Sequence, residues 1–187
     1  MSPSSAGSVI VIGGGARAGK SAFALARAQQ LGERRAFIAT AQAFDHEMSA
    51  RIAAHVAERG AAFETYEVPH ALPETLETLQ ADVAIVDCLT LWLSNMLLQD
   101  RPAEHVLGEV ERLVNVIEAR RMHVLIVTNE VGMGIVPDNA LARAFRDLAG
   151  RAHQRLADIA DELYFGALGV MLRLRPAPIE LAKAQTP

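Results

Sequence analysis

A glycine-rich octapeptide near the start of the chain constrains the fold more than any other feature. It reads GGARAGKS at 14–21 and fits the pattern G-x-x-x-x-G-K-[ST]. The apolar run VIVI at 9–12 leads into it through Gly13, and SAFALARAQQL, a run of helical period, begins at its last residue. A strand that turns through such a loop straight into a helix is typical of layered folds in which strands and helices alternate. We therefore expect an α/β fold.

The rest of the chain repeats this alternation of short β-branched runs and longer segments of helical period. The pattern predicts a mostly parallel sheet flanked by helices, of the P-loop NTPase type. Strands are expected at 8–12, 36–40, 63–68, 82–86, 123–128 and once within 163–174. Helices are expected near 20–31, 45–59, 70–80, 89–99, 103–121 and 139–161. Residues 1–187 are expected to form a single domain, with irregular tails at 1–8 and 175–187.

Two of these helices have clear apolar faces. In the helix near 139–161, which Asp138 or Asn139 can cap, the expected buried stripe is Leu141, Phe145, Leu148, Ala152, Leu156 and Ile159. In the helix that follows Pro102, the expected buried face is Val106, Val110, Leu113 and Ile117.

Composition excludes several classes of protein. The chain has 187 residues, 51% of them apolar, and a formal net charge of −4, which gives no general attraction for nucleic acid or anionic lipid. Its one cysteine, Cys88, cannot form an intramolecular disulfide, and this favours a reducing compartment. No apolar run approaches the roughly 20 residues that a membrane span needs. We expect a cytoplasmic protein that binds no nucleic acid and has no membrane span.

The glycine-rich loop has the chemistry of a phosphate site. Glycines allow backbone N–H groups to turn around phosphate oxygens, and the N-terminus of the following helix adds partial positive charge. Lys20 can reach the β- and γ-phosphates, and Ser21 can ligate Mg²⁺. The expected nucleotide-binding residues of the loop are Gly14, Gly15, Ala16, Arg17, Ala18, Gly19, Lys20 and Ser21. The plain alternative is a glycine-rich turn with an incidental lysine.

Two further strands end in polar residues. The strand VAIVD ends at Asp87, which is expected to hold Mg²⁺ opposite Ser21, or alternatively to cap the helix after Cys88. The strand HVLIVT runs into NEVGMGIVP, in which Glu130 could act as a base or a metal-shell group. Asn and Glu after a strand are also ordinary turn and cap residues.

A polar stripe follows the predicted helix near 45–59, where Glu47, Arg51, His55 and Arg59 recur at steps of four. His46 is about half a helical turn out of phase with His55, so both histidines cannot face one site. Taken alone, the stripe is a solvated face with a Glu47–Arg51 pair.

Four segments together resemble the bifunctional adenosylcobinamide kinase/adenosylcobinamide-phosphate guanylyltransferase family. They are GGARAGKS, FIATAQAFDHEMSARIAAH, DCLTLWLSNML and VTNEVGMGIVPDNALARAFRDLAGRAHQRLA, and the likeness extends over about residues 9–174. A phosphate loop alone would indicate only a nucleotide, whereas VTNEVGMGIVP and RIAAH at these separations are specific to the family. The loop departs slightly from the family pattern, with Ala18 where serine is frequent.

The resemblance implies a cobalamin-assembly enzyme with two activities that use Mg²⁺-bound ATP or GTP. It phosphorylates adenosylcobinamide and then transfers GMP from GTP to adenosylcobinamide phosphate, with release of pyrophosphate. The GMP rests transiently on a histidine of the RIxxH segment, which maps onto His55. Lys20 and Asp87 complete the implied catalytic set. The other implied nucleotide contacts are Ala39, Thr40, Ala41, Arg59, Glu67 and again Asp87. Thr40 could instead merely cap, and Glu67 could be a solvent-facing strand residue.

Other interpretations stay open at this stage. A simple small-molecule kinase would need no covalent intermediate, and a nucleotide-dependent module acting on DNA would share the loop. Trp92 could pack beneath a flat ring system or lie in the core or a subunit interface. The apolar run around Trp92 makes a homo-oligomer plausible, and His153 is expected to be structural or exposed.

Overall fold

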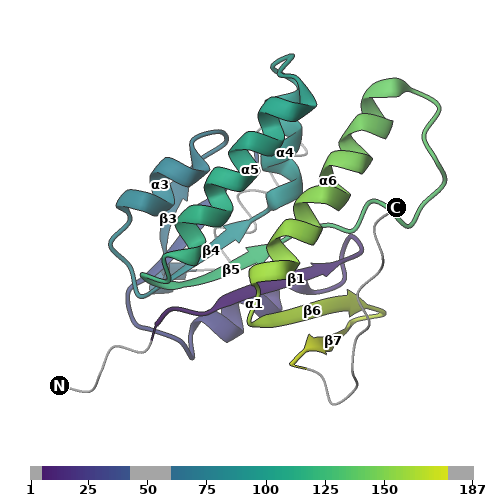
Figure 1. The fold of residues 1–187 in the computed structure, drawn as a ribbon. Helices are drawn as coiled ribbons and strands as arrows, with labels where there is room; N and C mark the ends of the chain where they lie inside the picture. Colours follow the sequence, from purple (N-terminus) through teal and green to yellow (C-terminus); the bar gives the residue numbers. More distant parts are fainter. Residues whose placement is uncertain (1–5, 43–59, 177–187) are drawn as a thin grey trace.

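The computed structural model describes residues 6–42 and 60–176, which form a seven-stranded sheet with helices on both faces (Figure 1). The strand order is β3-β2-β4-β5-β1-β6-β7. The strands are β1 (Val9–Gly14), β2 (Arg35–Ala39), β3 (Glu64–Glu67), β4 (Val83–Asp87), β5 (His123–Val127), β6 (Glu162–Ala167) and β7 (Val170–Arg175). All neighbours are parallel except β6 and β7, so the predicted α/β fold is confirmed.

The helices divide between the two faces of the sheet. They are α1 (Lys20–Ala28), α3 (Leu72–Thr78), α4 (Leu89–Leu97), α5 (Ala103–Glu118) and α6 (Ala140–Ile159), with a short 3₁₀ turn at Gly60–Ala62. Helices α3, α4, α5 and α6 lie over one face, and α1 lies on the other (Figure 1). The predicted helix at 45–59 lies outside the described residues.

Alternation along the central strands supplies both cores. In β1, Val9 and Val11 pack against the helices of the first face, whereas Ile10 and Ile12 pack on the side of α1. The other central strands alternate in the same way, because successive side chains of a strand point to opposite faces. Burial on both faces explains why these strands are almost continuously apolar.

The C-terminal strand region differs from the sequence prediction. The structure has two strands, β6 and β7, joined as an antiparallel hairpin, where the sequence predicted one strand within 163–174. The turn residues Leu168 and Gly169 both have positive φ, as a two-residue hairpin turn of type I′ requires. Arg175, expected in the irregular tail, ends β7 and pairs with Leu163.

Helix α6 confirms most of its predicted stripe. Asn139 caps it by accepting a 2.7 Å hydrogen bond from the Ala142 N–H, which decides between the two predicted caps. Leu148, Ala152 and Leu156 are buried, but Leu141 is 53% exposed and does not belong to the stripe. Leu141 lies in the first turn, which extends beyond the packed part of the helix. No helix of the described ranges is long and apolar enough to cross a bilayer.

Candidate active site

The carboxyl ends of the central parallel strands bring the predicted site residues to one edge of the sheet. Gly14 ends β1, Asp87 ends β4, and Thr128 follows β5, which lies between them. Ala39 ends β2 and lies opposite both Asp87 and Glu67 in the register. This edge is where open α/β sheets bind ligands.

The loop between β1 and α1 needs glycine at two positions. Gly14 has φ +137°, and a Cβ there would lie 2.3 Å from the Gly166 carbonyl oxygen of the neighbouring β6. Gly19, the residue before α1, has φ +87° and lies in the left-handed region. Ala18 is buried beside Gly166, so the small residue at this position fits a close approach to β6. The backbone therefore has the tight strand-to-helix turn that the sequence predicted.

Lys20 is held inside this turn. Its side chain is buried, and Nζ donates a 2.6 Å hydrogen bond to the Gly15 carbonyl oxygen. Burial lowers the pKa of Lys20, while the nearby Cys88 and Asp87 oppose the shift. The ammonium therefore lies inside the loop, hydrogen-bonded to a loop carbonyl oxygen.

Asp87 and Ser21 are the oxygen donors of the predicted metal site. Asp87 is half-buried at the end of β4, and its charge acts on Lys20. The first residue after it, Cys88, is the N-cap of α4, so Asp87 does not have the capping position that was the alternative. A hydroxyl and a carboxylate are hard oxygen ligands that suit Mg²⁺ when nucleotide phosphates supply further oxygens. Within 6–42 and 60–176, no cluster of three or more His, Cys, Asp or Glu side chains forms a metal site made of protein alone.

Thr40 has a structural role that the sequence left open. Its hydroxyl is fully buried, donates to the Cys88 carbonyl oxygen at 2.7 Å and accepts from the Cys88 N–H at 2.8 Å. Its carbonyl oxygen accepts from the Asn95 amide at 2.8 Å. Thr40 therefore joins β2 to the start of α4, and its side chain is not open to a nucleotide. Ala39 and Ala41 beside it are half-buried.

Glu67 is exposed at the end of the edge strand β3. Its register partner is Ala39, so Glu67 lies, like Asp87, at the carboxyl ends of the strands. Its strand β3 is two strands away from β4, which carries Asp87. The side chain is therefore accessible both to solvent and to a ligand at this edge.

The segment after β5 contains a polar cluster that the sequence only half indicated. His153 of α6 lies with Nε2 2.7 Å from the Thr128 hydroxyl and Nδ1 3.7 Å from a Glu130 carboxylate oxygen. Glu130 also donates its backbone N–H to the Gly14 carbonyl oxygen at 3.0 Å. The sequence singled out Glu130 as a candidate, whereas nothing local to His153 indicated that Thr128, 25 residues away, is its partner.

A sequence model described as cobinamide kinase / cobinamide phosphate guanyltransferase matches residues 10–174. The chain belongs to this family. Two curated relatives agree with the assignment. A Pseudomonas aeruginosa protein named bifunctional adenosylcobalamin biosynthesis protein CobP is 42% identical over 168 residues, which cover 89% of this chain and 96% of the relative. A Salmonella typhimurium protein named bifunctional adenosylcobalamin biosynthesis protein CobU is 36% identical, over 89% of this chain and 99% of the relative.

Solved structures support the fold of this family member. The RadB recombinase structure has a TM-score of 0.51 at 14% identity, and covers 84% of this chain and 73% of its own. An ATPase from a bacterial type III secretion system has a TM-score of 0.51 at 11% identity, covering 84% and 50%. At such identities the likeness concerns the fold alone.

Two predicted residues of the family site belong to the segment before residue 60. His55 and Arg59 lie outside the described residues, as do Glu47, Arg51 and His46. Their assignment therefore stays a prediction from the sequence.

Trp92 belongs to the core. It is fully buried in α4, and its indole N–H donates a 2.7 Å hydrogen bond to the His70 carbonyl oxygen. The packing of α4 inside the chain accounts for the apolar run that suggested a subunit contact, because Leu89, Leu93, Met96 and Leu97 are also buried.

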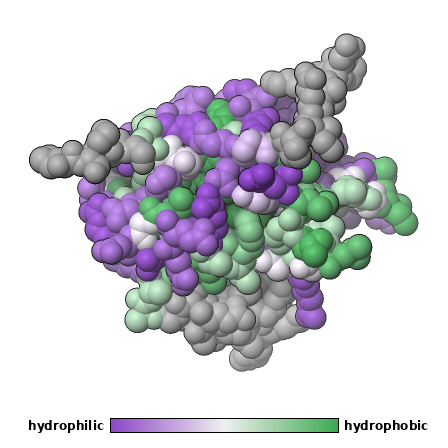
Figure 2. Space-filling view, turned by 90° about the horizontal axis from the view of Figure 1, so that it is seen from below, coloured by the Kyte–Doolittle hydropathy of each residue, from purple (hydrophilic) through white to green (hydrophobic). Residues whose placement is uncertain are grey.

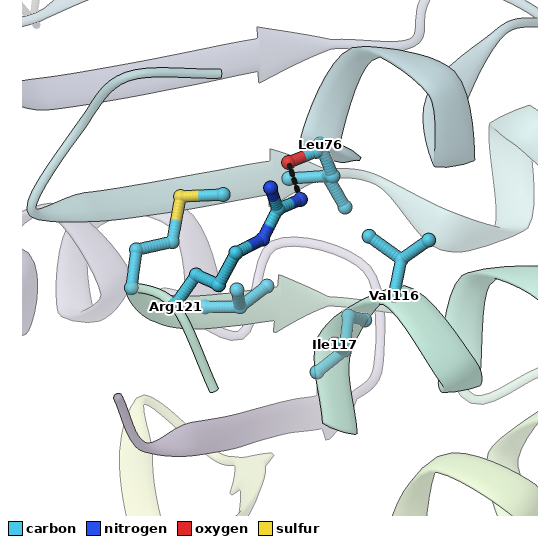
Figure 3. Close-up of a pocket in the computed structure, with 6 residues that line it drawn as sticks. Leu76, Val116, Ile117 and Arg121 are labelled. Carbon is cyan, nitrogen blue, oxygen red and sulfur yellow. Dashed lines mark hydrogen bonds between the residues drawn. The ribbon is translucent and has the colours of Figure 1, made fainter. Parts of the chain in front are cut away.

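A small apolar pocket lies away from the site (Figure 3). Leu76 of α3, Val116 and Ile117 of α5 line it, and the Arg121 guanidinium crosses it to the Leu76 carbonyl oxygen. It adjoins the amino-terminal end of β5, at the edge of the sheet opposite the phosphate loop. This pocket is therefore no part of the candidate active site.

Proposed function

We propose that this protein phosphorylates adenosylcobinamide with ATP or GTP and then transfers GMP from GTP to adenosylcobinamide phosphate, as a transferase of cobalamin biosynthesis. The observation that carries the proposal is the family match over residues 10–174, which includes every described element of the phosphate site. The curated relatives, named as bifunctional enzymes of adenosylcobalamin biosynthesis, support the same activity.

Both reactions would use one nucleotide site. The backbone from Gly14 to Gly19 would surround phosphate oxygens, and Lys20 would neutralise charge on the β- and γ-phosphates. Ser21 and Asp87 would hold Mg²⁺, which when bound neutralises charge on the phosphates. Ala39, Ala41 and Glu67 would contact the nucleotide from the neighbouring strand ends, with Thr40 holding this region in place.

The guanylyl transfer would pass through His55. A neutral imidazole nitrogen attacks the α-phosphorus of GTP, an N–P bond forms, and the bond to pyrophosphate breaks. A phosphate oxygen of adenosylcobinamide phosphate then attacks the same phosphorus, and the N–P bond breaks, which restores the imidazole. Arg51 and Arg59, four residues to either side of His55, would neutralise the charge that develops on phosphorus.

The remaining expectations concern compartment and partners. The buried free thiol of Cys88 supports a cytoplasmic location. A net charge of −4 supports the absence of nucleic acid among the partners. We expect a homo-oligomer because of exposed apolar residues outside α4, whose own apolar residues are buried in the core. Hydrophobic residues gather on one side of the face in Figure 2, and Leu168, Val170 and Leu172 of the β6–β7 hairpin are exposed. Light scattering after size exclusion measures the oligomeric state.

A product assay tests the proposed function. Adenosylcobinamide, Mg²⁺ and ATP should give adenosylcobinamide phosphate, and further addition of GTP should give adenosylcobinamide-GDP and pyrophosphate, both followed by chromatography and mass spectrometry. Arg151→Gln, a change on the exposed side of α6, serves as the control and should leave both products unchanged. Formation of the phosphate without the GDP product would instead identify a simple kinase.

A further inference from the structure

Thr128, Glu130 and His153, here called the β5 cluster, form a polar group beside the phosphate loop. Thr128 is buried directly after β5, while the Glu130 side chain is 28% exposed and so remains open to a substrate. His153 comes from α6, which packs over β1 and supplies the imidazole from the helical layer. The cluster joins two layers of the fold at the edge where the predicted site lies.

The tautomer of His153 decides which ring nitrogen is the donor and which is the acceptor. Burial lowers the pKa of His153, although Glu130 opposes the shift, so the ring is neutral at pH 7 and has one donor and one acceptor nitrogen. In the tautomer in which the Thr128 hydroxyl donates to Nε2, the ring proton lies on Nδ1, 3.7 Å from a Glu130 carboxylate oxygen. In this tautomer the neutral imidazole places an N–H beside the carboxylate without removing its negative charge.

The Glu130 carboxylate is held from a second side. One of its oxygens accepts the Gly132 backbone N–H, and the Gly132 carbonyl oxygen in turn accepts a 2.9 Å hydrogen bond from Arg146 of α6. A carboxylate has about four lone-pair sites, so these contacts fix its direction and leave acceptor capacity free. Fixed and partly exposed, it has the properties of a group that accepts a proton from a bound substrate.

The position relative to the phosphates follows from the sheet. Strand β5 lies between β1, which leads into the phosphate loop, and β4, which ends at Asp87. The Glu130 N–H is bonded to Gly14, the first residue of the loop. A nucleotide held by this loop therefore has the residues that follow β5 beside it.

We propose that Glu130 is the proton acceptor of the kinase step and that His153 is the positioning residue that orients it. The inference rests on the proposed function. As the substrate hydroxyl oxygen attacks the γ-phosphorus, its proton passes to a Glu130 carboxylate oxygen, the new O–P bond forms, and the bond to the nucleoside diphosphate breaks. The proton then leaves Glu130 to solvent.

The guanylyl transfer gives this proposal a control within the same protein. Its nucleophiles are an imidazole lone pair and an ionised phosphate oxygen, and neither has a proton that must be removed for attack. A change at Glu130 should therefore impair phosphorylation selectively, whereas damage to the fold or to nucleotide binding would impair both reactions.

Glu130→Gln is the first test, because glutamine keeps the shape and an acceptor for Gly132. We expect kcat for phosphorylation of adenosylcobinamide to fall by about a hundredfold or more. Transfer of GMP to supplied adenosylcobinamide phosphate should stay within about threefold of wild type. Glu118→Gln, at the exposed C-terminal end of α5 and on the opposite edge of the sheet, removes the same charge and should change neither rate.

The two amides that replace His153 test its positioning role. Asparagine places an amide donor near the Nδ1 position that faces Glu130, and glutamine places it near the Nε2 position that faces Thr128. We expect His153→Asn to keep kinase kcat within about threefold and His153→Gln to lower it at least tenfold, with the KM for ATP unchanged in both. Melting temperatures of both variants report any loss of packing.

Three results would overturn the inference. These are a kinase kcat near wild type in Glu130→Gln, an equal loss of both reactions in that variant, and equal effects of the two His153 substitutions. Failure of the guanylyl half of the proposed function would look different, because the wild-type protein would then form no GDP product while the kinase rates of the variants still reported on Glu130. A wild-type protein that forms neither product would reject the proposed function and the inference that rests on it.

Discussion

Lys20 carries a charged side chain that is buried in the loop proposed to bind phosphate. Its ammonium has the Gly15 carbonyl oxygen as hydrogen-bond partner, and burial lowers its pKa. Such a group lowers the stability of the unliganded protein, since water solvates the ammonium better in the unfolded chain.

We therefore expect Lys20→Met to weaken ATP and GTP binding at least a hundredfold without lowering the free energy of unfolding at pH 7. The folded-state pKa of Lys20 lies below the unfolded value of 10.5. At any pH between these two values, the unfolded chain therefore holds more protons than the folded protein. Wild type should then gain stability relative to Lys20→Met between the folded-state pKa and about pH 10.5. Urea unfolding of both proteins at the two ends of this range measures the difference in their free energies of unfolding. We expect this difference to shift in favour of wild type at the higher pH, and no shift would contradict the prediction.

Among single residues, the sequence allowed a prediction only where the expected role depends on residues close by in the chain. Lys20 and Asp87 follow from a loop and a strand end that can be read locally. The hydroxyl of Thr40 is bonded to Cys88, 48 residues away, and His153 is bonded to Thr128, 25 residues away. Such partners are set by the strand order, which the sequence does not contain.

Among the elements, the turn between α1 and β2 is fastened to the start of β4 by Asp82. The carboxylate accepts the backbone N–H groups of Glu33 and Arg34 and two bonds from the Arg34 guanidinium, at 2.6–3.2 Å. These bonds, with the Arg34 side chain the largest cause, lower the pKa of Asp82 to about 2.

Asp82→Asn should lower the free energy of unfolding at pH 7 by about 1 kcal/mol, since solvent reduces the full value of the pKa shift at an exposed site. The contribution of the carboxylate is present above pH 3.8 and is lost as pH falls through about 2. Denaturant titrations at pH 7 and near pH 2 should show the difference between variant and wild type shrinking. Glu104→Gln, an exposed change on α5, serves as the control. A pH-independent difference would show that the ionised carboxylate of Asp82 is not the source of the stabilisation.

The cap of α6 affects the whole helix that supplies His153. Asn139→Ala removes the acceptor for the Ala142 N–H and should cost about 1 kcal/mol of stability, whereas Asn139→Ser should cost only a few tenths. Thermal unfolding of the two variants measures the difference. Equal melting temperatures would show that the cap contributes nothing.

The elements themselves were largely predictable, with ends shifted by a few residues. The β6–β7 hairpin was not, because its turn consists of Leu168 and Gly169, and a leucine with positive φ gives no turn signal. The apolar character of 163–174 therefore predicted a single strand where the chain reverses.

Across the whole molecule, stability comes from the two cores on the faces of the sheet. Leu156 and Leu141 belong to the same helix, yet Leu156 is fully buried and Leu141 is 53% exposed. We expect Leu156→Ala to cost about 2–5 kcal/mol and Leu141→Ala less than about 0.5 kcal/mol. Equilibrium unfolding in urea gives both values, and similar costs would refute the position of α6 on the sheet.

The layered architecture followed from the sequence, but the order of the strands did not. The central strands β1, β4 and β5 are all short and apolar, and nothing in their composition distinguishes a neighbour. The observed order lets α4, α5 and α6 bury their apolar sides together on one face of the sheet. It places β5 between the phosphate loop and Asp87, and so creates the setting of the β5 cluster.

We propose that one phosphate site serves both phosphoryl and guanylyl transfer, the second through His55. The most direct measurement incubates the protein with Mg²⁺ and GTP labelled at the α- or the γ-phosphate, quenches in denaturant and compares wild type with His55→Ala and with His46→Ala as the matched control. We expect that only α-label stays on the chain, that the bond is acid-labile and alkali-stable, and that the label is lost in His55→Ala alone. Bound GTP with neither label retained on wild type, or label retained in His55→Ala, would contradict it.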